Sequence, residues 1–303
     1  MSEIDLVRLN FNPASLALLN VVLGLVMFGV AMDLTLADFA RVARRPLPVV
    51  IGLACQFLLL PALTFLLVGA LHPAPSIALG MMLVAACPGG NISNFLTHHA
   101  RGTTAVSVTM TAISTAAAIV MTPFNLAFWA SRNAETRAIL ADVALDPVQL
   151  VTAVLLLLGV PMAAGLYAAH RHPAWVARMR RPMRRFSLGA FGLFVVAALA
   201  ANWTHFRSWV PMVAVAVLLQ NGMALAIGYV GATAARLPEA DRRAVAIEVG
   251  IQNSGLGLIL VLNFFGGLGG MAVVTAWWGI WHMVSGLALA SFWARRPPAP
   301  AAG

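Results

Sequence analysis

The chain has 303 residues, of which 61% are apolar and only 10% are charged, and its mean hydropathy is +0.88. Because a water-soluble domain carries about 25% charged residues, this chain has too few polar residues to cover a soluble protein's surface. The composition predicts an integral membrane protein. It excludes a nucleic-acid-binding protein, although the formal net charge is +9 and all 19 basic residues are arginines.

Nine apolar segments are long enough to cross a bilayer, which takes about 20 residues of helix. The first has no basic region before it, so we expect a retained span and no cleaved signal peptide. The sequence therefore predicts an all-α membrane protein with nine transmembrane helices, in which residues 1–303 form a single polytopic unit. In chain order the predicted spans are 14–36, 47–70, 76–97, 103–129, 148–169, 186–204, 210–235, 244–264 and 271–294.

The arginines gather in every second loop between these spans and at the C-terminus. Fifteen lie on this side, against four on the other. Since short cytoplasmic loops accumulate positive charge, we expect the N-terminus outside and the C-terminus in the cytoplasm. The fifteen are Arg41, Arg44, Arg45, Arg101, Arg171, Arg178, Arg180, Arg181, Arg184, Arg185, Arg236, Arg242, Arg243, Arg295 and Arg296.

An arginine-rich loop, predicted around residues 170–185, divides the spans into four, a fifth, and four more. The two sets of four begin on opposite sides of the membrane. Inverted repeats of this kind are typical of secondary transporters, whose substrate site lies at the repeat interface near the membrane midplane.

The third and eighth predicted spans are each interrupted by helix-breaking and polar residues. The third contains the run from Cys87 to Asn94, Cys-Pro-Gly-Gly-Asn-Ile-Ser-Asn, and the eighth contains the run from Glu248 to Gly255, Glu-Val-Gly-Ile-Gln-Asn-Ser-Gly. Proline removes a backbone donor and glycine relaxes the backbone, so both helices should break there. Matched broken helices indicate a transport site. The alternative is a glycine-rich packing kink whose polar side chains bond back to the chain.

Glu248 is the only acidic residue that we expect inside the membrane, where ionisable groups are costly and usually functional. The alternative interpretation is that Glu248 is a solvated carboxylate in the first turn of its helix. In the fourth span, Ser107 and Thr111 share one helix face with Ser114 and Thr115, and for the latter pair we expect only packing or bonds to the preceding turn.

Isolated amides occur at Gln56 in the second span and at Gln220 and Asn221 in the seventh, and we expect them to bond to the backbone of the broken helices. One carboxylate, several neutral oxygens and freed carbonyls suit a hard monovalent cation such as sodium. The sequence has no nucleophile–base pair, phosphate-binding loop or metal-type histidine spacing, so we expect no enzyme. His282, among tryptophans, is interpreted as a hydrogen-bonded core histidine from its surroundings.

Several motifs together resemble the bile acid:sodium symporter (BASS) family. They are Cys87-Pro88-Gly89-Gly90 with Ser93-Asn94, Ala100-Arg101-Gly102, and Glu248-Val249-Gly250 with Gln252-Asn253-Ser254-Gly255. The resemblance spans about residues 16–293 and implies an inverted-repeat transporter with a panel domain, a core domain and two unwound helices that cross. The panel would hold spans 14–36, 148–169 and 186–204, and the core the other six. Bacterial relatives with ten helices have one more at the start, so nine would match the animal members.

The same resemblance implies the site residues. One sodium site would comprise Ser93, Asn94, Ser107, Thr111 and Glu248. A second would comprise Gln56, Glu248, Val249, Ile251 and Gln252, with Val249 and Ile251 giving backbone carbonyls. The substrate would contact Asn91, Ile92, Asn253, Ser254 and His282, and the chain has Met283 where some relatives have asparagine.

The resemblance implies a sodium-coupled symporter of an organic anion, driven by two sodium ions and working by alternating access. The cargo would be a bile-acid-like steroid or a small carboxylate such as pantoate or pyruvate, bound by the amide ends of half-helices. We expect the lipid bilayer of a bacterial inner membrane as surroundings, with no nucleic acid and no obligate protein partner. The alternatives are a proton-coupled carrier or cation/proton antiporter of related architecture, and an intramembrane enzyme or receptor.

Overall fold

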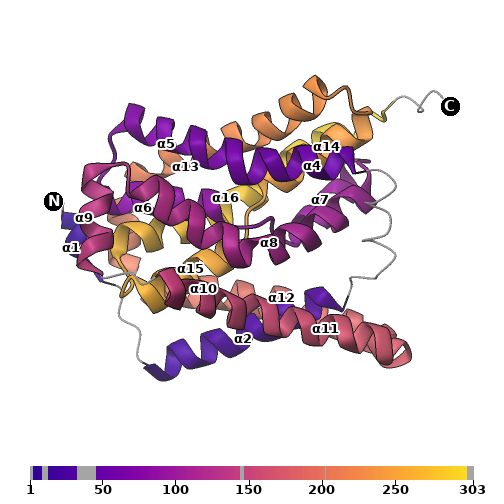
Figure 1. Cartoon of the computed structure of the whole chain (residues 1–303), viewed down its shortest axis with the longest axis horizontal. Coiled ribbons are helices and arrows are strands. Elements are labelled where there is room, and N and C mark those ends of the chain that lie inside the picture. Colours follow the sequence, from indigo (N-terminus) through magenta and orange to yellow (C-terminus); the bar gives the residue numbers. More distant parts are fainter. Residues whose placement is uncertain (1–2, 9–12, 33–45, 144–146, 202, 299–303) are drawn as a thin grey trace.

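The fold is described by a computed structural model that covers residues 3–8, 13–32, 46–143, 147–201 and 203–298 (Figure 1). These residues are mostly helical and contain no β-strand beyond two isolated β-bridges. The predicted all-α class is confirmed. Arg41, Arg44 and Arg45 of a predicted loop lie outside the described residues, as does the end of the predicted span 14–36.

Seventeen helical elements follow one another along the described chain, two of them π-helical turns. Each π-turn is followed by a proline, Pro61 or Pro161, and the missing N–H of that proline prevents a regular helical hydrogen bond. The elements are α1 (Glu3–Leu6), α2 (Pro13–Ala31), α4 (Leu47–Ala54), η1 (Cys55–Leu59), α5 (Leu60–Leu71), α6 (Pro75–Ala86), α7 (Ile92–His99), α8 (Thr104–Ala130), α9 (Ala134–Asp142), α10 (Pro147–Val154), η2 (Leu155–Gly159), α11 (Val160–Arg171), α12 (Pro173–Ala201), α13 (Trp203–Ala234), α14 (Glu239–Gly250), α15 (Ser254–Phe264) and α16 (Gly269–Ala294).

Five helical stretches of the described residues are long and apolar enough to cross a membrane. Three shorter apolar helices accompany them, and two of these, α6 and α15, are halves of interrupted helices that are each too short to span alone. The count of nine spans stays a prediction. The five long stretches are Leu47–Leu71, Thr104–Ala130, Val148–Arg171, Trp209–Ala234 and Gly269–Ala294.

Two helices extend beyond the predicted spans. The predicted arginine-rich loop at 170–185 is helical, because α11 ends at Arg171 and α12 begins at Pro173. Arginine is a good helix former, so a charged run lengthens a helix as readily as it ends one. The helix that enters the predicted span 244–264 starts before it, because α14 begins at Glu239 with acidic residues in its first turn, which suit a helix N-terminus.

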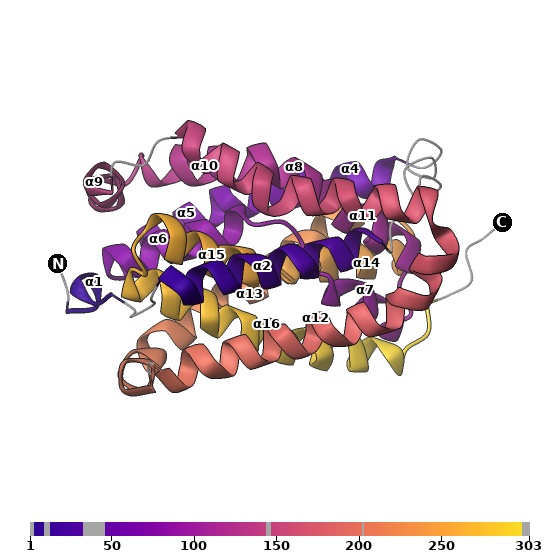
Figure 2. The ribbon, with the colours of Figure 1, turned by 90° about the horizontal axis from the view of Figure 1, so that it is seen from below.

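The helices lie in two groups. α2 packs against α11 and α12, and these helices run with α10 along one side of the molecule (Figures 1 and 2). α2 and α11 approach closely at Gly165, where a Cβ atom would overlap the backbone of Phe28. The interrupted helices lie in the other group, among α4, α5, α8, α13 and α16 (Figure 1).

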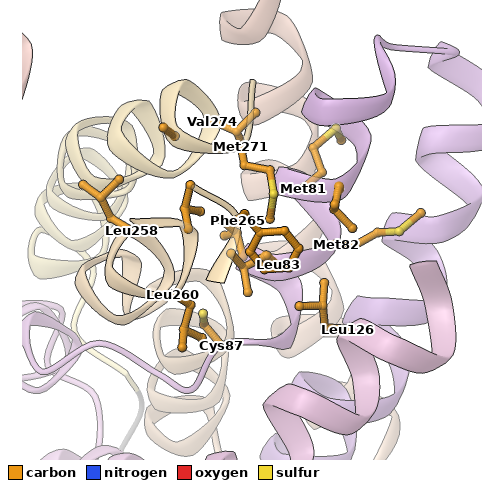
Figure 3. Close-up of a cluster of buried hydrophobic side chains, with 14 of the residues drawn as sticks. Met81, Met82, Leu83, Cys87, Leu126, Leu258, Leu260, Phe265, Met271 and Val274 are labelled. Carbon is orange, nitrogen blue, oxygen red and sulfur yellow. The ribbon is translucent and has the colours of Figure 1, made fainter. Parts of the chain in front are cut away.

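Buried apolar side chains fill the space between α6, α15 and α16 (Figure 3). Met81 and Leu83 of α6 meet Leu260 of α15 and Met271 of α16, and all four are fully buried. α6 and α16 come close at Gly80, where a Cβ atom would overlap the backbone of Met271. This dense packing holds α6 and α15 firmly where each reaches its break.

The two interruptions cross each other. α6 ends at Ala86 and α7 begins at Ile92, while α14 ends at Gly250 and α15 begins at Ser254. The extended segments between them pair in an antiparallel manner through a bridge between Gly89 and Gln252. The amide of Gly90 donates to the Ile251 carbonyl at 2.7 Å, and the amide of Asn253 donates to the Pro88 carbonyl at 2.8 Å. Backbone groups freed by each break are thus satisfied by the other.

Candidate functional site

Glu248 lies in the last turn of α14, next to the crossing, and its side chain is completely buried. It is therefore not the solvated first-turn carboxylate that the sequence also allowed. Three hydroxyl groups donate to it: Ser93 at 2.5 Å, Ser107 at 2.8 Å and Thr111 at 2.6 Å. Ser93 comes from α7 and the other two from α8, so the carboxylate joins three helices.

Asn94 adds a further oxygen to this group. Its Oδ1 accepts from the hydroxyl of Ser107 at 2.9 Å and lies 3.3 Å from that of Thr111. Each hydroxyl has one proton, yet Ser107 and Thr111 each face Oδ1 of Asn94 as well as the carboxylate. The three hydroxyls make five contacts with these acceptor oxygens, so the contacts outnumber the three protons available to them. All five residues of the first predicted sodium site are therefore connected through these side-chain oxygens.

No basic side chain of the described residues forms an ion pair with Glu248, and the nearby Arg243 is paired with Glu239 instead. A buried, unpaired carboxylate costs several kcal/mol unless another charge compensates it. A cation held between the carboxylate and the neighbouring neutral oxygens would supply that charge. Oxygen donors of this kind suit a hard cation better than a soft one.

Glycine is required where the first break passes the carboxylate. A Cβ atom at Gly89 would overlap the Oε1 atom of Glu248, and a Cβ atom at Gly90 would overlap the carbonyl group of Gln252. The two glycines therefore allow the extended segments to lie against each other and against the acid. Lack of space thus explains the Gly-Gly pair at the first break.

A second polar group surrounds Gln56 on the π-turn η1. Its Nε2 atom lies 3.4 Å from the Cys87 carbonyl and 3.3 Å from Oε1 of Gln252, whose own Nε2 donates to the Val249 carbonyl at 2.7 Å. Oε1 of Gln56 is buried without a hydrogen-bond partner. An orphaned buried acceptor of this kind is what a cation would satisfy.

Only part of the second predicted set is joined by contacts in the structure. Gln56, Val249 and Gln252 are connected, whereas the Ile251 carbonyl is engaged by the amide of Gly90. No hydrogen bond joins the Glu248 side chain to Gln56 or Gln252 in the described structure.

Amide side chains of α13 hold the broken helices, as the sequence predicted. Gln220 donates to the Met81 carbonyl of α6 at 2.8 Å, and Asn221 donates to the Gly250 carbonyl at the end of α14 at 2.8 Å. Ser285 of α16 donates in turn to Oδ1 of Asn221 at 2.6 Å. The Gly250 carbonyl, left at the end of a half-helix, therefore has a specific partner, whereas the Met81 carbonyl lies within α6.

The predicted substrate residues fall at three places. Asn91 and Ile92 lie at the start of α7 and are partly exposed, whereas Ser254 at the start of α15 is buried. Asn253 caps α15, since its Oδ1 accepts from the amide of Leu256 at 3.0 Å. His282 is buried on α16 and its Nδ1 atom has no partner. No hydrogen bond connects its ring to the crossing within the described chain.

Sequence reasoning missed the role of Arg243, which was assigned to a cytoplasmic loop. Its side chain is buried and forms an ion pair with Glu239, one helical turn earlier. The available signal was the spacing of this acid and this arginine by four residues, which favours a pair on one helix face.

Comparison with known proteins identifies the family. The model of the sodium bile acid symporter family matches residues 20–209, which is more than half of the chain. The chain belongs to the sodium bile acid symporter family. It is accordingly a multi-pass membrane protein of a sodium-dependent transporter family, and the family resemblance seen in the motifs is confirmed.

Relatives within this family come from bacteria, plants and animals. The chain is 32% identical to the uncharacterized sodium-dependent transporter YocS of Bacillus subtilis over 94% of this chain and 85% of YocS. It is 30% identical to the probable chloroplast sodium/metabolite cotransporter BASS1 of Arabidopsis thaliana, over 91% of this chain and 66% of that protein. It is 27% identical to the human ileal sodium/bile acid cotransporter, over 81% and 69% of the two chains.

Proposed function

We propose that this sodium bile acid symporter family member is a sodium-coupled symporter of an organic anion that works by alternating access. The observation that carries this proposal is the complete burial of Glu248 among neutral oxygens, without a basic partner in the described structure. A basic side chain would neutralise the Glu248 carboxylate permanently. A bound sodium ion would neutralise it only when the sodium concentration is high enough.

Two sodium ions are proposed. The first would be held by Ser93, Asn94, Ser107, Thr111 and Glu248, each of which has a side-chain oxygen within hydrogen-bond distance of at least one other in the set. The second would lie beside the orphaned Oε1 of Gln56, with Gln252, the carbonyls of Val249 and Ile251, and the carboxylate. Some of these groups would have to exchange their present hydrogen bonds for the ion.

The substrate is proposed to be an organic anion bound where α7 and α15 begin. Helix N-termini carry partial positive charge and unpaired amides, which favour a carboxylate or sulfonate. Asn91 and Ile92 on one side, Asn253 and Ser254 on the other, and His282 of α16 would line the site. The names of the relatives from human ileum and plant chloroplast support a steroid or a small metabolite as cargo.

The proposed transport movement takes place between the two helix groups. The panel would comprise α2, α10, η2, α11 and α12, and the core the helices that surround the crossing. Nine spans, with the N-terminus outside a bacterial inner membrane, would carry this arrangement. Each sodium ion moving inward would contribute about 2.3 kcal/mol per 100 mV of membrane potential.

A thermal-unfolding screen of the purified protein tests the proposal. Bile acids, pantoate, pyruvate and related carboxylates are added in sodium chloride and, in parallel, in potassium chloride. We expect sodium alone to raise the melting temperature, and one class of anion to raise it further only in sodium. Stabilisation and uptake that follow pH and ignore sodium would instead favour a proton-coupled carrier or antiporter.

A further inference from the structure

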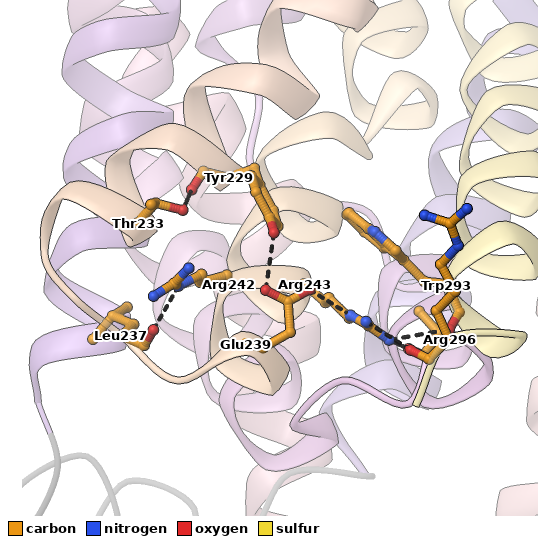
Figure 4. A network of polar contacts seen from close by, with 9 residues as sticks. Tyr229, Thr233, Leu237, Glu239, Arg242, Arg243, Trp293 and Arg296 are labelled. Atoms are coloured by element: carbon orange, nitrogen blue, oxygen red, sulfur yellow. Dashed lines mark hydrogen bonds and ion pairs between the residues drawn. The ribbon is translucent and has the colours of Figure 1, made fainter. Parts of the chain in front are cut away.

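A buried arginine ties together three helix ends on the cytoplasmic-facing side predicted from the charge distribution. Arg243 lies near the start of α14 (Figure 4). Its side chain is only 5% exposed. Its Nε atom donates to Oε1 of Glu239 at 2.8 Å. Glu239 is held in turn by Tyr229, whose hydroxyl donates to Oε2 at 2.9 Å. The charge of Arg243 is thus balanced within α14.

The remaining guanidinium donors leave α14 altogether. Nη1 donates to the Ala100 carbonyl at 3.0 Å and to the Trp293 carbonyl at 3.1 Å, and Nη2 donates to the Arg296 carbonyl at 2.8 Å. Ala100 directly follows α7, and the other two residues lie at the end of α16. Carbonyls at a helix C-terminus lack intrahelical partners and face a negative dipole end, so a cationic fork suits them.

The linker between α7 and α8 is docked on the same part of α14. The amide of Thr103 donates to the Ala240 carbonyl at 3.0 Å. At Gly102 a Cβ atom would crowd the backbone of Ala240 and Ala244, so the linker lies directly against the helix. α14 is therefore fixed to the α7–α8 pair at its first turns.

The same helices meet again at the candidate cation site. Glu248 follows Arg243 by five residues, or about 7.5 Å along the helix axis. Its hydroxyl partner Ser93 belongs to α7, and Ser107 and Thr111 belong to α8. Any shift of α14 along the α7–α8 pair would therefore separate the carboxylate from all three hydroxyls together.

We propose that Arg243 is a positioning residue for the sodium site, because it fixes the register of α14 against α7 and α8. This inference rests on the proposed sodium-coupled function. A solvated arginine in a cytoplasmic loop would only help to set the membrane topology, whereas the buried guanidinium of Arg243 would hold three helices in place. The planar fork is needed because one group must reach the ends of two helices at once.

The test compares sodium titrations of the purified protein, followed by its thermal stabilisation. We expect Arg243→Met to raise the half-saturating sodium concentration about tenfold or more. In uptake assays at saturating sodium, the KM for the transported anion should stay within about twofold of wild type. Arg243→Lys keeps the charge but lacks the planar guanidinium, so the half-saturating sodium concentration of this variant should also rise.

Arg242→Gln is the matched control, since this neighbour is only partly buried and donates to the Leu237 carbonyl of the preceding linker. It should titrate like wild type. If Arg243→Met does not fold, Glu239→Gln serves as the test, because it keeps an acceptor for Nε of Arg243 but removes the charge of the ion pair. We expect this variant to raise the half-saturating sodium concentration about threefold.

The outcomes separate this inference from the proposed function. A wild-type protein that is not stabilised by sodium contradicts the function itself. The positioning role is overturned if sodium stabilises the wild-type protein and both Arg243 variants have the same half-saturating sodium concentration as wild type. If those variants do not fold, the same result for Glu239→Gln overturns it. So does a variant in which the KM for the anion rises while the sodium titration is unchanged.

Discussion

At the scale of single residues, Glu248 combines a charged side chain with complete burial, and its hydrogen-bond partners are three hydroxyl groups. A hydrogen bond to a charged group contributes about 1.5–3 kcal/mol, and a tenfold change in affinity corresponds to about 1.4 kcal/mol. Substitutions around this carboxylate should therefore alter sodium binding by measurable factors, even where the fold is preserved.

Replacing the acid is the first prediction. Glu248→Ala should abolish sodium-stimulated uptake while leaving the protein inserted in the membrane, because the ion would lose its only charged ligand. Asp142→Asn changes an exposed acid at the end of α9 and serves as the control. Uptake is measured in proteoliposomes with an imposed sodium gradient. Sodium-driven uptake by the Ala variant at the wild-type rate would contradict the assignment.

Removing one hydroxyl ligand gives a graded prediction. Thr111→Val keeps the shape of the side chain but removes the hydroxyl that lies 2.6 Å from Oε1 of Glu248. We expect about a tenfold rise in the half-saturating sodium concentration. Thr115→Val is the matched control on the same helix, since that hydroxyl donates only to the Thr111 carbonyl. Equal titrations of the two variants would place the ion elsewhere.

The glycine next to the acid offers a steric prediction. A methyl group at Gly89 would overlap Oε1 of Glu248, whereas one at Gly69 in α5 meets nothing within 4 Å. Gly89→Ala should therefore weaken sodium stabilisation strongly, and Gly69→Ala should leave it unchanged. Thermal unfolding in sodium and in potassium checks both. A sodium response of Gly89→Ala equal to wild type would show that the carboxylate moves aside freely.

At the scale of helices and their ends, α15 begins at the crossing and is capped by Asn253. Losing a cap of this kind costs about 1 kcal/mol of stability. The same side chain is proposed to contact the substrate, so capping and binding can be separated only by choosing the replacement.

Two substitutions make that separation. Asn253→Ser keeps an oxygen that can accept from the amide of Leu256, so the melting temperature without ligand should stay near wild type. Asn253→Ala should lower it. Both variants lose the side-chain amide that is proposed to contact the substrate, so both should need a higher concentration of the transported anion for half-saturation. If only the Ala variant loses anion affinity, Asn253 acts through the helix cap alone.

The sequence predicted elements whose cause is local, and missed those whose cause is distant. Both breaks follow from proline, glycine and polar residues in one short run. The amides Gln220 and Asn221 were predictable as backbone partners because an isolated amide in an apolar helix needs one. The contacts of Arg243 with Ala100 and Trp293 were not predictable, since they join residues far apart in the chain. The helical course of the arginine-rich segment was missed because its charge pattern is typical of a loop as well.

At the scale of the whole molecule, the two helix groups meet through a reciprocal amide pair. Asn20 of α2 and Asn263 of α15 each donate to the other, at 3.2 and 3.1 Å. This pair spans the proposed boundary between panel and core. Because amides exchange partners with water at low cost, the contact is suited to a boundary that opens and closes.

Cross-linking across this boundary tests the proposed movement. In a chain with Asn20→Cys and Asn263→Cys, a short bifunctional thiol reagent should stop uptake but leave sodium stabilisation in place. The native cysteines Cys55 and Cys87 are buried, so wild type treated with the same reagent is the control. Full uptake by completely cross-linked protein would show that the two groups do not move apart at this point.

The pairing of the two extended segments also sets a condition on biosynthesis. Ser93 and Glu248 are 155 positions apart, so at about 5–20 residues per second the ribosome needs on the order of ten seconds to add the second after the first. Throughout that interval the peptide groups around Pro88 and Gly90 lack their native partners inside the newly inserted half of the chain. Insertion of this protein therefore includes a stage at which water, lipid headgroups or the insertion machinery must solvate an open segment that the finished molecule encloses.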